Sequence, residues 1–292
     1  MQFEGAVYRP PIEANTFLLQ VAVGCSHNKC SFCNMYKDEQ FRRIKLDTIE
    51  ENLIEAKRFY HKLERVFLVG GDAFALSATK LKEVAGLISR YFPECKTITM
   101  YAAVNNIVNK TDEDLLSLRE VGINDLYVGL ETGSDYALNY VNKGHTTQQA
   151  REQLKRLNKA NIRHNALLIT GLAGQGRGVE SALATASLLN ETEPQIIIST
   201  TLGIFENTKL KTEVEDGLFV EATESENLEE QLTLIKTLDL PSTYYWGHHP
   251  LNSTPIAGVL GEEQAQMVDV LSKKISTIND TEFKNSFRRS TL

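Results

Sequence analysis

The sequence predicts an α/β fold in which parallel strands alternate with helices. Three observations support this fold: six strand-like runs, a helix-like stretch after most of them, and continuous apolar residues in several of the runs. A continuous apolar run suits a strand that is buried on both faces, as in a parallel sheet covered by helices. The strand-like runs cover residues 17–23, 66–69, 97–102, 126–130, 165–170 and 195–200.

Polar capping residues indicate where the helices begin. A Ser, Thr or Asp side chain can accept one of the unpaired backbone N–H groups at a helix N-terminus, and an acid or amide three residues later can complete a capping box. The expected N-terminal caps are Asp47, Ser77, Thr111, Thr146 and Thr223. A final helix is expected over residues 262–278, before a polar and basic tail.

The pattern divides the chain into three segments. Residues 1–15 form an irregular lead-in, residues 16–210 contain the strand–helix units, and residues 211–292 form a small helical extension expected to cover that core. Residues 244–250, Tyr-Tyr-Trp-Gly-His-His-Pro, form an aromatic and His-rich loop within the extension.

The overall charge excludes some classes of partner. The chain has 292 residues, with 31 Lys and Arg against 38 Asp and Glu, and a formal net charge of −7. This acidic balance disfavours a nucleic-acid partner. No apolar run approaches the ~20 residues of a membrane helix, and the N-terminus lacks the order of a signal peptide. We therefore expect a cytoplasmic protein without a membrane partner, whose cysteines suit metal binding better than disulfides.

Three of the four cysteines lie within nine consecutive positions, directly after the first predicted strand. Cys25, Cys30 and Cys33 on one short loop can share a metal centre. Three thiolates without an evident fourth ligand suit a [4Fe–4S] cluster with one iron left open, since such iron is normally held by four cysteines. Zinc with His27 as fourth ligand is an alternative. The other alternative is three unrelated thiols in a core.

Further polar and glycine-rich motifs follow other predicted strands. Gly70-Gly71-Asp72 follows the second strand, Glu131 the fourth, and a glycine-rich turn from Gly171 the fifth. In a parallel sheet all these strand ends lie on one edge. Each motif alone is commonly a turn or a solvated charge. Their appearance together favours a ligand site at that edge.

With these motifs the chain resembles the radical S-adenosylmethionine (SAM) family. The cysteine triad resembles the family's Cys-x3-Cys-x2-Cys, with Phe32 as the aromatic before the last cysteine and with one additional residue in the first spacing. Gly70-Gly71-Asp72 resembles the Gly-Gly-Glu motif, and residues 129–134 are similar to the family's Gly-x-Glu-Ser-Gly-Ser. Lys143 falls where a basic residue often pairs with the SAM carboxylate.

The glycine-rich turn narrows the resemblance to a subgroup. Gly171-Leu172-x-Gly174-Gln175 resembles the turn of the oxygen-independent coproporphyrinogen oxidases and of the MiaB-like and Elongator-like enzymes. Some members carry an acid just before this turn, where this chain has Leu168. Glu131 would then serve the SAM ribose alone.

The resemblance implies a partial (β/α)6 TIM-like barrel that binds a [4Fe–4S] cluster and SAM. The cluster would be held by Cys25, Cys30 and Cys33. The expected SAM-binding residues are Phe32, Gly70, Gly71, Asp72, Glu131, Lys143 and Gly171. One electron from the reduced cluster would cleave SAM to methionine and a 5′-deoxyadenosyl radical, which abstracts hydrogen from a substrate. The implied partner is a low-potential electron donor such as flavodoxin or ferredoxin.

The sequence leaves the substrate open, as a small molecule or a macromolecule. Cys95 is the only cysteine outside the triad, so it cannot hold a second cluster by itself. His248 and His249 are candidates for proton transfer at the barrel mouth, although the aromatics beside them can equally pack over the open edge of the barrel. The competing function is non-catalytic: an iron–sulfur electron carrier or a zinc-stabilised binding module.

Overall fold

The computed structural model describes residues 3–287 and residue 289, and divides the chain into two compact units. The first unit comprises the described residues up to Asn28 together with Met35–Gly129 and Glu152–His164. The second comprises Lys29–Asn34, Leu130–Arg151 and the chain from Asn165 onward. The cysteine loop is therefore divided, because Cys25 belongs to the first unit and Cys30 and Cys33 to the second.

The first unit is built on a parallel sheet. Its strands are β1 (Phe17–Gln20), β4 (Arg65–Val69), β5 (Thr97–Ala102) and β6 (Ile123–Glu131), which pair in that order. The last two residues of β6 belong to the second unit. Leu19 pairs with Leu68, Leu68 with Met100, and Met100 with Leu126. These four side chains are fully buried, as expected for a sheet that is covered on both faces.

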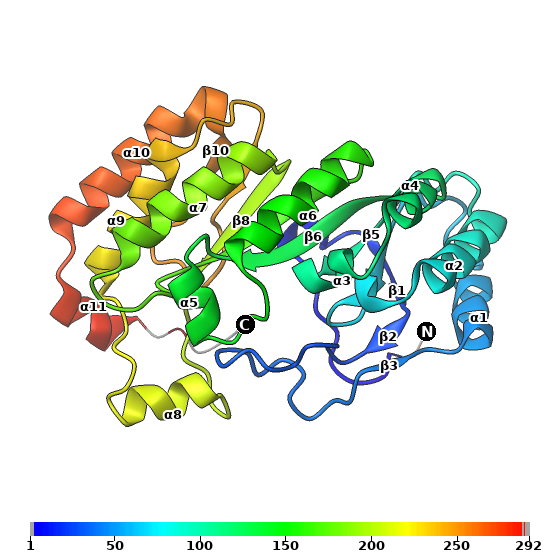
Figure 1. The fold of residues 1–292 in the computed structure, drawn as a ribbon, viewed down its shortest axis with the longest axis horizontal. Helices are drawn as coiled ribbons and strands as arrows, with labels where there is room; N and C mark the ends of the chain where they lie inside the picture. The colour runs from blue at the N-terminus through cyan, green and yellow to red at the C-terminus, as the bar shows by residue number, and fades with distance from the viewer. Residues whose placement is uncertain (1–2, 288, 290–292) are drawn as a thin grey trace. The chain divides into compact units, whose positions relative to one another are not determined.

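Helices flank the strands of the first unit (Figure 1). The longest are α1 (Leu46–Lys57) and α2 (Ala78–Tyr91), which pack against each other, and α4 (Asp112–Glu120) packs on α2. The shorter elements are η1 (Pro11–Glu13), η2 (Ala73–Ala75), α3 (Val104–Val108) and the antiparallel strands β2 (Ala22–Val23) and β3 (Arg42–Arg43).

The second unit has its own strands and helices. The strands β7 (Arg163–Thr170), β8 (Ile196–Thr201) and β9 (Tyr244–Trp246) are parallel, and β10 (Ala257–Val259) is antiparallel to β9. The helices α7 (Gly178–Thr192) and α10 (Leu260–Thr277) both pack on α9 (Glu224–Thr237) (Figure 1). The remaining helices of this unit are α5 (Asp135–Tyr140), α8 (Lys209–Glu215) and α11 (Asp280–Ser286). Helix α6 (Thr147–Lys159) and strand β7 are each divided between the units, because Glu152–His164 belongs to the first unit.

The predicted fold class is confirmed. All six predicted strands are present, as β1, β4, β5, β6, β7 and β8, and they run parallel wherever their pairing is described. Four of the five expected caps also form. Ser77 accepts a bond from the N–H of Lys80, and Thr111, Thr146 and Thr223 form capping boxes with Asp114, Gln149 and Glu226. The predicted boundaries after residues 15 and 210 stay predictions.

Local details of the prediction were wrong in three places. The run 17–23 is divided at Val21, because Ala22 and Val23 pair with β3 instead of continuing β1. Helix α1 begins at Leu46 without a side-chain cap, so Asp47 lies inside its first turn. The aromatic segment 244–250 begins as strand β9, and the fully buried Tyr245 is part of the sheet.

The segment expected as a lead-in contains a short 3₁₀ helix, η1, with a buried charged residue. Glu13 in η1 is 3% exposed, and its carboxylate accepts bonds from Arg65 and from the hydroxyl of Tyr127 at 2.6 Å. Arg65 also bonds to Asp125 at 2.7 Å. Hydrogen bonds to the charged form hold the pKa of Glu13 below its usual value, although burial alone would raise it. This paired network satisfies charges that would be costly if buried alone.

None of the helices in the described residues is long and apolar enough to cross a membrane.

Candidate functional site

In the first unit, the start of the cysteine loop is seated on the turn that follows β4. The N–H of Gly71 donates to the carbonyl oxygen of Gly24 at 2.8 Å. The N–H of Ser26 donates to Oδ1 of Asp72 at 2.8 Å, and the Ser26 hydroxyl donates to the other oxygen of the same carboxylate. The backbone on both sides of Cys25 is therefore bonded to the Gly70–Asp72 turn.

The glycines of this turn allow the close approach. A Cβ on Gly71 would lie 2.7 Å from the carbonyl oxygen of Gly24 and 2.8 Å from Cβ of Cys25. A Cβ on Gly70, whose φ is +151°, would lie 2.9 Å from Cβ of Ala22. Separations this short are essentially excluded for real side chains, so both glycines are needed here for packing. The space into which a side chain at residue 71 would project is thus occupied by the residues around Cys25. The predicted approach of this backbone to SAM stays a prediction.

The additional residue in the first cysteine spacing is accommodated at Asn28. Its φ of +44° lies in the left-handed region, which Asn tolerates better than most residues. Its side-chain amide donates to the carbonyl oxygen of Tyr36 at 2.7 Å, and its own carbonyl accepts a bond from Lys37 at 3.3 Å. The longer loop is therefore bent and anchored at one defined position.

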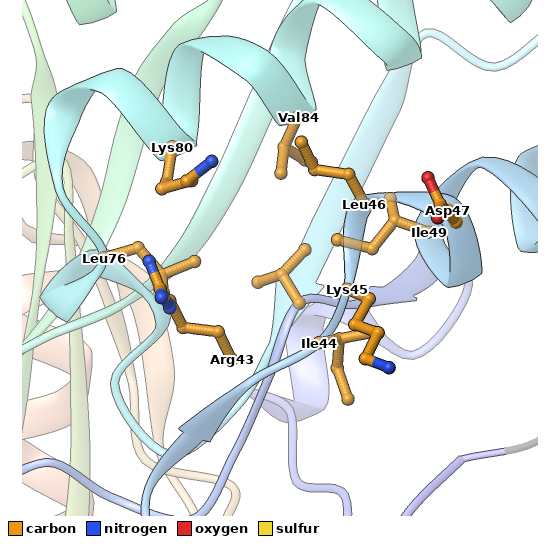
Figure 2. Close-up of a pocket in the computed structure, with 10 residues that line it drawn as sticks. Arg43, Ile44, Lys45, Leu46, Asp47, Ile49, Leu76, Lys80 and Val84 are labelled. Carbon is orange, nitrogen blue, oxygen red and sulfur yellow. The ribbon is translucent and has the colours of Figure 1, made fainter.

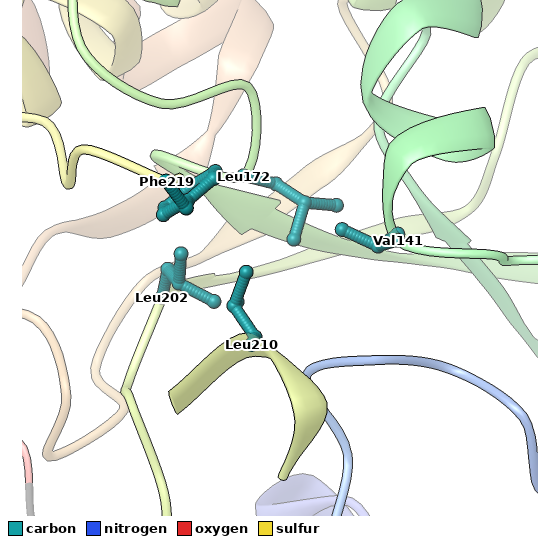
Figure 3. Packing of buried hydrophobic residues seen from close by; sticks show 5 residues of the cluster. All are labelled: Val141, Leu172, Leu202, Leu210 and Phe219. Carbon is teal, nitrogen blue, oxygen red and sulfur yellow. The ribbon is translucent and has the colours of Figure 1, made fainter. Parts of the chain in front are cut away.

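In the second unit, backbone hydrogen bonds hold the segment that contains Cys30 and Cys33. The N–H of Ser31 donates to the carbonyl oxygen of Val141, and the N–H of Leu210 donates to that of Ser31, both at 2.9 Å. Phe32 packs against a buried hydrophobic cluster. The cluster, shown in Figure 3, consists of Val141, Leu172, Leu202, Leu210 and Phe219. Phe32 thus anchors the second half of the cysteine loop, which is an apolar packing role that the sequence did not predict.

Glu131 and Lys143, predicted separately as SAM ligands, form an ion pair in the second unit. The side chains are 10% and 12% exposed, respectively. Glu131 ends β6 with φ +65°, an uncommon conformation for a residue with a side chain. Backbone strain of this kind concentrates at functional sites. The pair places one carboxylate and one ammonium group together at the end of a strand.

The glycine-rich turn after β7 is held by helix α9. The N–H of Gly171, with φ +83°, donates to Oε2 of Glu230 at 2.8 Å, and the N–H of Gly176 donates to Oε1 of Glu226 at 2.8 Å. A Cβ on Gly171 would lie 2.5 Å from Oδ1 of Asn227. These contacts were not predicted from the sequence, where the available signal was the polar face of the helix capped at Thr223.

Burial changes the acidity of Glu230. The side chain lies between the glycine-rich turn and helix α7, where Ser181 also bonds to it. Burial raises the pKa of Glu230 to about 7, against the opposing effect of the bonds from Gly171 and Ser181. Glu230 therefore titrates near neutral pH.

The two candidate catalytic histidines follow β9 in the second unit. Nδ1 of His249 accepts a bond from the N–H of Leu251 at 3.2 Å, and burial lowers the pKa of this imidazole. The ring of His248 lies 6.3 Å from that of Trp246. Tyr245 accepts a bond from Gln231 at 3.1 Å inside the unit. The predicted proton-transfer role of these histidines stays a prediction.

The donor set fits an iron–sulfur cluster in chemistry and in sequence. Cys25, Cys30 and Cys33 are all partly exposed thiols outside disulfides. Among the described residues there is no group of three or more His, Cys, Asp or Glu side chains placed to hold a metal ion. The fit therefore rests on two observations. The three potential ligands are thiols, and Gly71 and Asp72 form hydrogen bonds to the residues on either side of Cys25.

A separate pocket of about 340 Å³ lies in the first unit (Figure 2). Apolar side chains, among them Val21, Leu76 and Val84, line it together with the cations of Arg43, Lys45 and Lys80. Asp47 is also in its lining. None of the residues predicted to bind the cluster or SAM lines this pocket.

Comparison with known proteins identifies the class. Residues 19–185 match the profile of the radical SAM superfamily. The match covers more than half of the chain, so the chain belongs to this superfamily. Its members are enzymes that bind a [4Fe–4S] cluster and SAM.

Among curated proteins, the chain is similar to two proteins named heme chaperone HemW. It is 26% identical to that of Bacillus subtilis (strain 168) over 172 residues, which are 57% of this chain and 45% of the relative. It is 26% identical to that of Lactococcus lactis subsp. lactis (strain IL1403) over 154 residues, which are 52% of this chain and 40% of the relative. The chain thus spans less than half of the length of these relatives.

Solved structures share the fold. Coproporphyrinogen III oxidase (HemN) from Escherichia coli, described as a radical SAM enzyme, aligns with a TM-score of 0.52 at 19% identity, over 64% of this chain and 44% of that chain. Elp3 from the archaeon Methanocaldococcus infernus aligns with a TM-score of 0.55 at 10% identity, over 94% of this chain and 64% of that chain. At these identities the likeness concerns the fold, and it agrees with a partial barrel.

Proposed function

We propose that this chain cleaves SAM reductively and uses the resulting radical on a substrate. Cys25, Cys30 and Cys33 would hold the cluster. When bound, the cluster supplies the electron that breaks the sulfonium C–S bond, giving methionine and a 5′-deoxyadenosyl radical that abstracts hydrogen. The observation that carries the proposal is the seating of the cysteine loop on the Gly70–Asp72 turn, because it joins two of the predicted motifs at one strand end.

The remaining residues of the site would bind and orient SAM. Lys143 would pair with the methionine carboxylate and Glu131 would accept bonds from the ribose hydroxyls. Their ion pair supports this assignment. Lys143 already binds one carboxylate and would also bind that of the methionine, and Glu131 already accepts from one donor and would also accept from the ribose. The Gly171 turn, held by Glu230, would offer a backbone surface without side chains to the adenine.

Electron supply and location complete the proposal. The protein would accept single electrons from a low-potential donor such as flavodoxin or ferredoxin, in the cytoplasm. Cluster potentials span roughly −700 to +450 mV, and the cluster of this protein would lie low in that range because a sulfonium is difficult to reduce.

The proposal is tested by anaerobic reconstitution with iron and sulfide, followed by dithionite and SAM, with 5′-deoxyadenosine measured by chromatography. We expect product from the wild type, none from Cys30→Ala, and wild-type amounts from Cys95→Ala, which removes a thiol outside the loop. Wild-type protein that carries a complete cluster but forms no product would contradict the proposal. Zinc in place of iron would favour the binding module, and a redox-active cluster without SAM cleavage would favour the electron carrier.

A second candidate function is haem handling, which the names of the two curated relatives favour. It is tested by titrating the purified protein with haem and recording the absorbance change near the Soret band. Saturable binding of one haem per chain would support this function. Binding that is equally strong in an unrelated acidic protein would argue against it.

A further inference from the structure

Two hydrogen bonds from Ser26 join Asp72 to the cysteine loop. Both oxygens of its carboxylate accept bonds from Ser26, one from the backbone N–H and one from the hydroxyl. Asp72 is 3% exposed, whereas Ser26 lies at the surface. Hydrogen bonds to a buried carboxylate are among the stronger ones in proteins. The Ser26–Asp72 pair therefore restrains the backbone directly after Cys25.

The turn that carries Asp72 is itself fixed by a buried lysine. Nζ of Lys110 donates to the carbonyl oxygen of Phe74 at 2.6 Å and to that of Asn106 at 3.3 Å. It also lies 4.1 Å from the centroid of the Phe74 ring. Phe74 is in η2, which begins at the residue after Asp72. Lys110 is 4% exposed. Burial lowers the pKa of its ammonium group to about 8, and the nearby charges of Asp114 and Asp72 oppose this shift.

We propose that Asp72 is a positioning residue for the iron–sulfur cluster, acting through Ser26 to hold Cys25 in place. This inference rests on the proposed function, because Cys25 must be a cluster ligand. It differs from the role expected from the sequence, in which Asp72 supplies negative charge to the methionine ammonium.

Two features of this chain favour the positioning role. The first is the length of the loop, because four residues between Cys25 and Cys30 leave more backbone freedom than a shorter spacing and increase the need for a restraint. Asn28 fixes the bend and the Ser26–Asp72 pair fixes the beginning. The second feature is the short side chain of Asp72, which accepts a bond from the N–H of Ser26 at 2.8 Å. A glutamate would carry its carboxylate one methylene group further from the backbone and would not fit this contact in the same way.

The test compares five variants of the full chain after anaerobic reconstitution, one of which combines Ser26→Ala with Asp72→Ala. Asp72→Ala removes both bonds of the pair, whereas Ser26→Ala removes only the bond from the hydroxyl, because the backbone N–H of residue 26 remains. Asp72→Asn keeps an acceptor for the N–H and a donor for the hydroxyl of Ser26, but not the charge. Ser272→Ala is the control, because that exposed hydroxyl donates only to the carbonyl of Val268 in its own helix. Two quantities are measured: the rate at which a chelator removes iron, and the SAM affinity from the change in the cluster's EPR spectrum.

We expect iron release to become about tenfold faster in Ser26→Ala and Asp72→Ala, as for the loss of a hydrogen bond to a charged group. The double variant should release iron no faster than Asp72→Ala, because both residues act as one unit. Asp72→Asn should stay within about threefold of the wild type, and Ser272→Ala should match it. SAM affinity of the iron-loaded protein should be unchanged in Ser26→Ala.

Two results would overturn the inference. One is unchanged iron release in Ser26→Ala, a surface substitution that should leave folding intact even if Asp72→Ala does not fold. The other is normal iron release together with equally weakened SAM binding in Asp72→Ala and Asp72→Asn. That result would mean that Asp72 binds the methionine ammonium group of SAM. The iron-release comparison does not depend on SAM cleavage, so iron-loaded wild type that forms no 5′-deoxyadenosine would contradict the proposed function alone.

Discussion

Replacing Glu230 by glutamine should change how the stability of the protein depends on pH. Glu230 is buried beneath the glycine-rich turn, where it accepts the N–H of Gly171. Glutamine has the same shape and keeps an acceptor for this N–H and a polar group for Ser181, but it does not titrate. The substitution therefore tests the charge of residue 230 with little change in packing.

The magnitude follows from the pKa of Glu230, which burial raises from 4.5 to about 7. Between these values the folded chain binds more protons than the unfolded chain, so the free energy of unfolding falls as pH rises. The stabilisation is complete below pH 4.5 and is lost as pH rises through about 7. The total loss is on the order of 3 kcal/mol, which corresponds to roughly 5–10 °C in melting temperature for a unit of this size.

The assay is thermal unfolding followed by circular dichroism under anaerobic conditions at pH 5, 6, 7 and 8. We expect Glu230→Gln to become progressively more stable than the wild type toward pH 8. Glu226→Gln is the matched control, because Glu226 lies one turn earlier on α9, is less buried and also accepts a glycine N–H, that of Gly176. Its stability relative to the wild type should not grow between pH 5 and 8. The reasoning is refuted if Glu230→Gln and the wild type differ by a constant amount over this range.

Three further predictions concern the candidate site. Cys30→Ala should abolish 5′-deoxyadenosine formation while Cys95→Ala keeps it, as measured by chromatography in the reconstituted protein. Glu131→Ala should weaken SAM binding at least about tenfold while iron content stays near wild type, since one charge-assisted contact is lost; a loss of iron would make Glu131 structural. Gly71→Ala should lower iron content and destabilise the fold by roughly 1–3 kcal/mol, because its Cβ would lie 2.8 Å from that of Cys25. Gly86→Ala, in α2 with nothing within 4 Å of the new Cβ, is the control and should be neutral or slightly stabilising in denaturant unfolding.

Much of the fold could be predicted from the sequence because its signals are local. The strands of a parallel sheet are continuously apolar, as in the run from Val66 to Val69, and four helix caps could be identified from residues three positions apart. Strand β9 was missed because three residues are too few to establish a period. Asp47 was wrong as a cap because α1 begins one residue before it, at Leu46, so that Asp47 lies within the first turn.

The candidate site was predictable in its ligand types but not in its supporting contacts. Three thiols in nine positions indicated a metal centre but left zinc open as an alternative, and membership of the radical SAM superfamily favours the iron–sulfur cluster. The sequence could not reveal that Asp72 bonds to Ser26, 46 positions away, or that Glu230 holds Gly171 from 59 positions away. Only the folded backbone brings such partners within hydrogen-bond distance, because chain position alone does not specify which polar groups meet. The sequence determined the succession of strands and helices and the clustering of the cysteines, while the tertiary structure decided which buried carboxylates hold the neighbouring loops, because those contacts form only when distant segments meet.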